Sequence, residues 1–296
     1  MATRALLSQP ATGWKPRLGF KSRWWLRFRR NRGALVGGVI VLLFIAIAVL
    51  APVLEPQSPT LQNLSQAQQP PSWANPLGTD ELGRDILSRI LAGAQISLLI
   101  TGTAVGVSLI LGSIIGLITG LYGGVIDTVL MRTMDVLLAF PGILLAMTII
   151  AVTGPGLSSL IFAIGISSMP IFARVARAST MLVTSMEYVT AARATGATDR
   201  DLIVRHLTPN IISPLIVQST VRLATAILAA SGLSFLGLGP QPPSSEWGAM
   251  LSTGRSYLTS APHIAVMPGL AIMIVVFGFN LLGDGLRDAF DPRRAE

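Results

Sequence analysis

Long uninterrupted apolar segments are the feature that most constrains this chain. The first covers residues 33–54 and contains no charged side chain. A helix needs about 20 mostly apolar residues to cross a bilayer, and five further segments approach or exceed that length, at about 96–121, 131–153, 156–178, 211–236 and 264–283. Charged residues make up only 12% of the chain, about half the share in soluble domains. The sequence therefore predicts an all-α membrane protein with six transmembrane helices.

The distribution of charge predicts the orientation. The net charge of +8 makes nucleic acid one option as a partner. However, nine basic residues precede the first span: Arg4, Lys15, Arg17, Lys21, Arg23, Arg27, Arg29, Arg30 and Arg32. The positive-inside rule explains this block better, and it places both termini in the cytoplasm. Segments 55–95 and 237–263 then face outward, and segment 179–210 faces inward.

The N-terminal segment also has an amphipathic pattern. Phe20, Trp24 and Phe28 recur every four residues, with arginines in a separate stripe. This pattern predicts a helix lying on the inner leaflet, and a disordered basic tail is the alternative. The glycines of the second span indicate close helix packing, with a pore-lining role as the alternative.

Some chemistry is excluded by composition. The chain has no cysteine, and its only lysines are Lys15 and Lys21. A Walker A loop requires a lysine after a glycine-rich run, so the chain does not hydrolyse ATP by that route. His206 and His263 fall on opposite sides of the membrane in the predicted topology, which argues against an enzyme with a histidine-based site. A secondary transporter remains a rival, although no internal repeat of the kind common in that class is evident.

The inward-facing segment 179–210 carries an ordered polar insert. Glu187 to Thr195 favours a helix with a nearly bare alanine face, and Gly196 can end it in a left-handed conformation. Asp199 is the expected N-cap of a second short helix over 200–206, and Pro209 stands where the next span begins. This predicts a helical bracket held between two spans. A docking site for another protein and a surface-lying loop without a partner are equally compatible with these residues.

The same segment resembles the coupling loop of ABC-importer permeases, which engages a separate ATPase. Ala191, Ala192, Gly196 and Pro209 match that pattern, whereas Thr190 stands in place of its glutamate. Arg193 and His206 follow the version found in peptide-type permeases. The departure at Thr190 weakens any expectation of a salt bridge from that position. The ATPase-coupling residues predicted by the resemblance are Glu187, Ala191, Ala192, Arg193, Gly196, Asp199, His206 and Pro209.

Four further stretches, around 77–98, 120–141, 233–248 and 279–293, resemble the C-type permease subunit of dipeptide, oligopeptide and nickel importers. The resemblance implies a type I ABC-importer fold in the cytoplasmic membrane of a prokaryote. It also implies a homologous second permease, two ATPases that hold the ATP and magnesium, and an extracytoplasmic binding protein. The chain itself would carry no cofactor or metal and bind no nucleic acid. Gln241, Glu246 and Trp247 are the candidate contacts for the binding protein, and a rigid proline-capped turn is the alternative.

Ionisable groups at membrane depth usually face a cavity or a partner. Arg222 either lines the translocation path, where it would contact a substrate carboxylate, or pairs with an acid of this chain or the partner, and the pairing is favoured. Asp135 either lines the path or pairs with Arg132. Arg174 and Arg177 are expected to mark the cytoplasmic end of the fourth span. The candidate path residues are Asp135, Arg222, Ser231, Ser234 and Phe235.

These expectations divide the chain into five segments. A basic cytoplasmic segment (1–32) precedes the first span (33–54) and an extracytoplasmic loop (55–95). The permease core (96–284) contains the coupling loop (187–209), and a cytoplasmic tail (285–296) follows. The predicted function is ATP-driven import of peptides by alternating access. Glutathione, nickel or another small solute is the alternative cargo.

Overall fold

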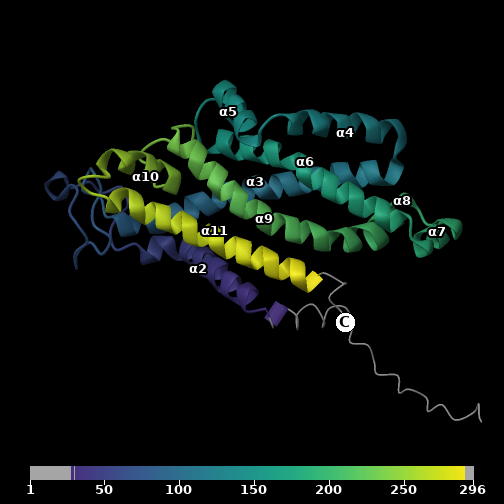
Figure 1. The fold of residues 1–296 in the computed structure, drawn as a ribbon, viewed down its shortest axis with the longest axis horizontal. Helices are drawn as coiled ribbons and strands as arrows, with labels where there is room; N and C mark the ends of the chain where they lie inside the picture. The colour runs from purple at the N-terminus through teal and green to yellow at the C-terminus, as the bar shows by residue number, and fades with distance from the viewer. Residues whose placement is uncertain (1–27, 30, 291–296) are drawn as a thin grey trace, which may run out of the picture.

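The computed structural model describes residues 28, 29 and 31–290, and this part of the chain forms an elongated helical bundle without strands (Figure 1). Five helices are long and apolar enough to cross a membrane: α2 (Arg32–Leu54), α3 (Ile86–Tyr122), α6 (Leu157–Thr184), α9 (Thr208–Phe235) and α11 (His263–Phe290). The all-α membrane prediction is confirmed. The predicted interfacial helix at Phe20 and Trp24 lies outside the described residues.

The third predicted span, over 131–153, is not one straight helix but a bent pair of helices, with the geometry of a broken span or a re-entrant loop. In the structure α4 (Gly124–Ala139) and α5 (Gly142–Thr153) meet at 93°. The cause is Pro141, whose ring disfavours a helical conformation at the preceding residue. Phe140 accordingly adopts φ −90° and ψ 137°. Counting this pair as one span gives the six that were predicted.

Helix α3 begins ten residues earlier than the predicted second span. Asp85 caps it, accepting hydrogen bonds from the backbone N–H and the hydroxyl of Ser88 at 2.8 and 2.7 Å. The charged segment from Asp80 to Asp85, which precedes the helix, forms turns. The polar residues before Ile86 therefore end in the N-cap of α3 and do not form its first turn.

Glycines allow α3 and α6 to pack at close range. A Cβ atom on Gly116 would lie 2.3 Å from the carbonyl oxygen of Ala173, and Gly112 and Gly120 meet α6 equally closely. At Gly102 and Gly106 nothing lies within 4 Å. The packing role predicted for these glycines is therefore confirmed at 112, 116 and 120, in the half of α3 that is parallel to α6.

Helices α2 and α11 pack against each other in opposite directions. Asn31, which caps the start of α2, donates a hydrogen bond to Asp288 near the end of α11. The start of α2 and the end of α11 therefore lie together, at the end of the bundle where α7 (Glu187–Ala194) is found (Figure 1). The opposite end carries α10 (Trp247–Gly254) and the connection between α2 and α3, which includes the short turn η1 (Leu64–Gln66). We call these the α7 end and the α10 end.

Large apolar side chains cover much of the outside of the bundle. Val49 on α2, Val125 on α4 and Phe277 on α11 are 70%, 78% and 55% exposed. Such surfaces are favourable only against lipid or another protein, which agrees with a membrane location.

Candidate functional site

Helix α7 presents a bare face at the α7 end of the bundle. Glu187, Thr190, Ala191 and Ala194 are exposed. Glu187 and Ala191, like Thr190 and Ala194, are four residues apart, so these side chains share one side of the helix. Val189 on the opposite side is fully buried. The small side chains of Ala191 and Ala194 leave this face able to fit closely into a groove of another protein.

A small hydrophobic core fastens α7 to the bundle. Val183 at the end of α6, Val189 of α7, and Leu202 and Leu207 before α9 are each at most 5% exposed and pack together. Leu121 at the end of α3 packs against them. The core thereby joins α7 to α3, α6 and α9, so a displacement of α7 would be transmitted to all three helices.

Polar contacts add to this attachment. The hydroxyl of Tyr122, the last residue of α3, donates to Asp199 at 3.1 Å. The side-chain amide of Asn210 donates to the hydroxyl of Tyr188 on α7 at 3.2 Å, and the Tyr188 ring lies 5.7 Å from that of His206. The sequence analysis did not identify either tyrosine. Their contacts are not visible as a local pattern, because the partner residues are 22 and 77 positions away along the chain.

The end of α7 matches the prediction. Gly196 has φ +89°, its N–H donates to Arg193, and the N–H of Ala197 donates to Ala192, both at 3.0 Å. This pair of bonds is a Schellman motif, in which a glycine in the left-handed region stops the helix. Nothing lies within 4 Å of a Cβ built at Gly196, so glycine is required by backbone conformation and not by lack of space.

The segment after Gly196 differs from the prediction in two respects. The N-cap of α8 (Asp199–Asp201) is Thr198, which forms a reciprocal capping box with Asp201, and Asp199 is the first helical residue. The separate helix predicted over 200–206 is also wrong. A π-helical segment, η2 (Leu202–Leu207), continues directly into α9, so the helix runs unbroken from Asp199 to Phe235. Pro209 lies in the first turn of α9, as expected.

A cavity of about 190 Å³ lies between α5, α6 and α9, and Arg222 is part of its wall. Its Nε atom is buried without a hydrogen-bond partner. Within the described part of the chain no acidic side chain forms an ion pair with Arg222. The favoured expectation, an ion pair with an acid, is therefore not met within the described residues of this chain.

Charges on α4 pair instead with α6. Asp127 accepts two hydrogen bonds from Arg177, both at 2.6 Å, and Asp135 accepts one from Arg174 at 2.7 Å. The predicted pairing of Asp135 with Arg132 is wrong, since Asp135 pairs across helices. Helix α6 continues beyond Arg174 and Arg177 to Thr184, and the placement of these two arginines at the cytoplasmic end of the span stays a prediction.

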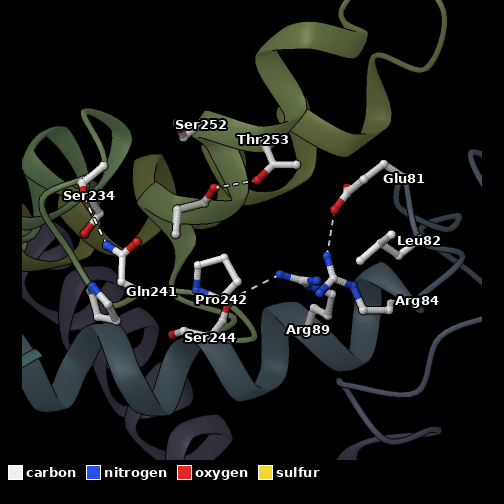
Figure 2. A pocket seen from close by; sticks show the side chains of 13 residues that line it. Glu81, Leu82, Arg84, Arg89, Ser234, Gln241, Pro242, Ser244, Ser252 and Thr253 are labelled. Atoms are coloured by element: carbon white, nitrogen blue, oxygen red, sulfur yellow. Dashed lines mark hydrogen bonds and ion pairs between the residues drawn. The ribbon is translucent and has the colours of Figure 1, made fainter. Parts of the chain in front are cut away.

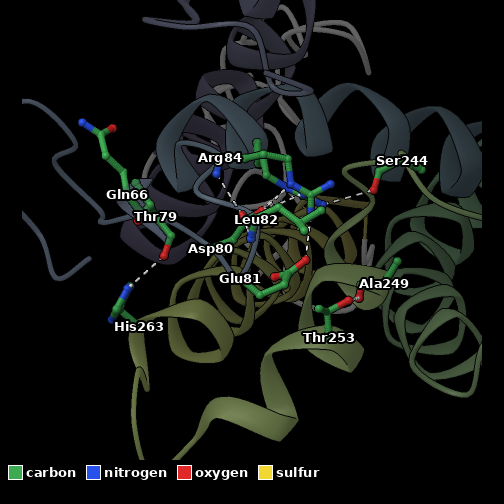
Figure 3. Close-up of polar contacts among 11 residues, drawn as sticks. Gln66, Thr79, Asp80, Glu81, Leu82, Arg84, Ser244, Ala249, Thr253 and His263 are labelled. Atoms are coloured by element: carbon green, nitrogen blue, oxygen red, sulfur yellow. Dashed lines mark hydrogen bonds and ion pairs between the residues drawn. The ribbon is translucent and has the colours of Figure 1, made fainter. Parts of the chain in front are cut away.

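The α10 end contains a buried ionic cluster (Figure 3). The carboxylate of Asp80 accepts from Arg84 Nε at 2.6 Å and from Arg89 Nη1 at 2.8 Å, and all three side chains are at most 6% exposed. Arg84 also pairs with Glu81 at 2.7 Å, and Arg89 donates to the carbonyl of Ser244 at 3.3 Å. The cluster ties the start of α3 to the loop before α10. The two arginines and Glu81 also line a cavity of about 360 Å³ with Gln241 and Pro242 (Figure 2).

Comparisons with known proteins agree with this architecture. Residues 112–296 match the family model described as binding-protein-dependent transport system inner membrane component. Residues 20–71 match the N-terminal TM domain of oligopeptide transport permease C. Since the first match covers more than half of the chain, it decides the family.

The chain belongs to the binding-protein-dependent transport permeases.

Two curated relatives refine the placement of this permease. It is 46% identical over 270 residues to the glutathione transport system permease protein GsiD of Pectobacterium atrosepticum, covering 91% of this chain and 90% of the relative. It is 46% identical over 267 residues to the dipeptide transport system permease protein DppC of Alkalihalophilus pseudofirmus, covering 90% and 88%. The predicted resemblance to C-type permeases of peptide importers is confirmed.

A solved structure supports the fold. The permease matches a chain of the methionine ABC transporter MetNI, in inward-facing conformations, with a TM-score of 0.56 and 18% identity. The match covers 70% of this permease and 98% of that chain. At this identity the match bears on the fold alone, and it agrees with the predicted type I importer fold.

Two residues proposed to contact a binding protein are inaccessible in this permease. Glu246 and Trp247 are both 0% exposed. Glu246 caps α10 by accepting from the N–H of Ala249 at 2.8 Å, and Trp247 donates its indole N–H to the carbonyl of Ile90 at 3.1 Å. Glu246 thus caps α10 and Trp247 joins α10 to α3, and of the three candidate contacts only Gln241 is exposed.

Two of the predicted path residues are also packed within the permease. Ser231 and Ser234 are 8% and 2% exposed, and the backbone of Ser231 lies against Gly248 of α10. The ring of Phe235 lies 5.4 Å below the guanidinium carbon of Arg255. Of the proposed path residues on α9, Arg222 and Ser234 each line a cavity and each have a buried polar atom without a hydrogen-bond partner, but only Arg222 carries a charge.

Proposed function

We propose that this permease is one half of the membrane channel of an ATP-driven peptide importer. The observation that carries the proposal is α7, an exposed helix with a bare alanine face that is fixed to α3, α6 and α9 by a common core. A docking helix needs both properties, because an accessible face receives a partner and a rigid attachment transmits its movement. The curated relatives named for dipeptide and glutathione transport support peptides as the class of cargo.

The proposal assigns ATP hydrolysis and its magnesium to two separate ATPase chains, one of which receives α7. A homologous second permease completes the channel, and an extracytoplasmic protein delivers the peptide. The α7 end then faces the cytoplasm, with both termini of the chain, and the α10 end faces outward. The basic block before α2 supports this orientation.

The transport step is alternating access. When the ATPases close, α7 moves and the long helices reorient from inward-open to outward-open, so that the channel accepts a peptide. Hydrolysis then restores the inward-open state. No covalent bond to the permease forms in this cycle, and the residues Glu187, Ala191, Arg193 and His206 act only by contact with the ATPase.

The test is uptake of a radiolabelled dipeptide by proteoliposomes that contain the complete complex and its binding protein. We expect uptake that requires ATP, persists when ionophores collapse the ion gradients, and stops when a Walker A lysine of the ATPases is replaced by alanine. Uptake that follows the ion gradient and ignores ATP would refute the proposal in favour of a secondary transporter.

Glutathione is the second candidate cargo, since one of the two relatives with 46% identity is named for it. Glutathione is itself a tripeptide, so the two candidates differ mainly in side chains and in the γ-linkage. Competition separates them. A tenfold excess of unlabelled glutathione that abolishes dipeptide uptake would identify a shared path, whereas glutathione without effect would restrict the cargo to ordinary peptides.

A further inference from the structure

Arg222 lies near the middle of the unbroken helix that runs from Asp199 to Phe235. A guanidinium group in a membrane-spanning segment is costly unless a cavity or an opposite charge accommodates it. Here the cavity of about 190 Å³ is present, the Nε donor is buried and unpartnered, and the ion pairs of the described residues leave Arg222 without an acid. The site therefore has an uncompensated positive charge beside space that can hold a small group.

Besides Ser168, two other polar side chains line this cavity and complement an arginine. Ser167 donates its hydroxyl proton to the carbonyl of Ile164 at 3.1 Å, and Thr225 donates to the carbonyl of Arg222 at 3.0 Å. Because these protons are already engaged, the two hydroxyl oxygens offer lone pairs to an incoming N–H group. The cavity thus combines one cationic donor with two acceptors, the arrangement suited to a carboxylate attached to an amide.

Arg222 also belongs to a polar stripe along α9. Gln218, Arg222 and Thr225 follow at spacings of four and three residues, so they lie on one side of the helix. Gln218 lines a second cavity, of about 550 Å³, between α6, α9 and α11 towards the α7 end. Two cavities in succession along one helix face are what a path through the membrane requires.

We propose that Arg222 binds the carboxylate of the transported peptide, as a charge-recognition point within the membrane. This inference rests on the proposed function, since it specifies how the path selects its cargo. Arginine suits the role because its planar donors can hold both oxygens of a carboxylate. The competing occupant of the same site is an acidic side chain of the second permease.

The test compares two substrates in the reconstituted complex: a dipeptide with a free C-terminal carboxylate and the same dipeptide as its C-terminal amide. For each substrate, kcat/KM of the Arg222→Met complex is divided by that of the unsubstituted complex, so that any preference of the binding protein cancels. We expect a fall of about tenfold to a hundredfold for the free acid, the usual range for a lost charge-assisted hydrogen bond, and a fall of less than about threefold for the amide. Arg222→Lys is expected to fall between them, because it keeps the charge and loses the paired donors.

Arg132→Met is the matched control. It removes the same charge from an exposed position on α4, and both substrates are expected to be imported at the unsubstituted rate. An equal loss for acid and amide in Arg222→Met would overturn the inference, and reduced recovery of the second permease in the same preparation would identify the acid of that partner as the true occupant. Failure of the unsubstituted complex to import either peptide would instead refute the proposed function, so the two failures are distinguishable.

Discussion

The turn at Gly196 offers the sharpest test of how α7 is coupled to transport. Its φ of +89° lies in the left-handed region, and a Cβ built there meets nothing within 4 Å. Substitution by alanine therefore changes the backbone energy alone, by about 1–2 kcal/mol. If this free-energy cost applies only to the conformation of α7 that binds the ATPase, the apparent affinity of α7 for the ATPase drops by about 5- to 30-fold at most.

Gly196→Pro should have a larger effect for two reasons. Proline fixes φ near −65°, and it removes the N–H that donates to the carbonyl of Arg193 at 3.0 Å. Together these changes cost about 3 kcal/mol or more, which is beyond a hundredfold in a docking equilibrium. The expected order of coupling is therefore glycine, then alanine, then proline, while membrane insertion stays normal because α6 and α9 are unchanged.

The assay is peptide uptake per ATP hydrolysed in proteoliposomes of the complete complex. Gly102→Ala is the control, since Gly102 also has open space around it but lies within α3 at an ordinary helical φ. It should leave the ratio unchanged. Wild-type uptake per ATP in the proline variant would show that the Schellman turn does not hold α7 in its docking position, and the proposed coupling would have to be abandoned.

Three further predictions concern stability, each measured by thermal unfolding of the purified permease. Asp80→Asn should destabilise it by about 3–5 kcal/mol, because two buried arginines lose their shared carboxylate. Arg205→Gln, which removes the exposed partner of an ion pair 3.7 Å long, should change it by less than about 0.5 kcal/mol, and similar effects from both substitutions would contradict the assigned role of the cluster. Gly116→Ala should destabilise the permease by about 1–3 kcal/mol, because the added Cβ would lie 2.3 Å from a carbonyl oxygen. Gly106→Ala should not destabilise it, because nothing lies within 4 Å of a Cβ at that position. Equal effects from the two substitutions would argue against close packing of α3 on α6. Burial raises the pKa of Glu246 above its ordinary 4.5, so the folded state favours the neutral carboxyl group. The free energy of unfolding therefore falls as pH rises from about 4.5 through the raised pKa. Glu246→Gln should remove this fall and be more stable than the unsubstituted chain at alkaline pH, and parallel pH profiles of the two proteins would refute the assignment.

The features that the sequence analysis predicted correctly depend on short-range physics. Apolar length identified the spans because no bilayer-crossing helix can be short or polar. Gly196 was identified as a helix stop because the left-handed conformation belongs mainly to glycine. The bend at Pro141 and the N-cap at Thr198 also follow local rules, since Thr198 and Asp201 form the capping-box pattern. Both could have been predicted from the sequence.

The other errors concern contacts between distant parts of the chain. Arg89 meets Ser244 across 155 positions, and Trp247 meets Ile90 across 157. A tryptophan in a polar loop has the same local signal whether it anchors α10 to the bundle or receives a partner, and here it is fully buried. The prediction that Asp135 pairs with Arg132 was wrong for the same reason. A partner three residues along a helix is visible in the sequence, whereas the actual partner, Arg174, lies on another helix.

The geometry links the docking helix to the cavity without an intermediate element. The core beneath α7 includes the end of α6 and the residues that lead into α9, and these same two helices form much of the cavity wall around Arg222. Arg222 lies 15 residues beyond Leu207, or about 22 Å along a continuous helix. Because the helix is continuous from Leu207 to Arg222, we expect a displacement of α7 to move the cavity wall at Arg222. A substitution at Gly196 and a substitution at Arg222 should therefore act on one step, and their combined effect on uptake should be smaller than the product of the separate effects.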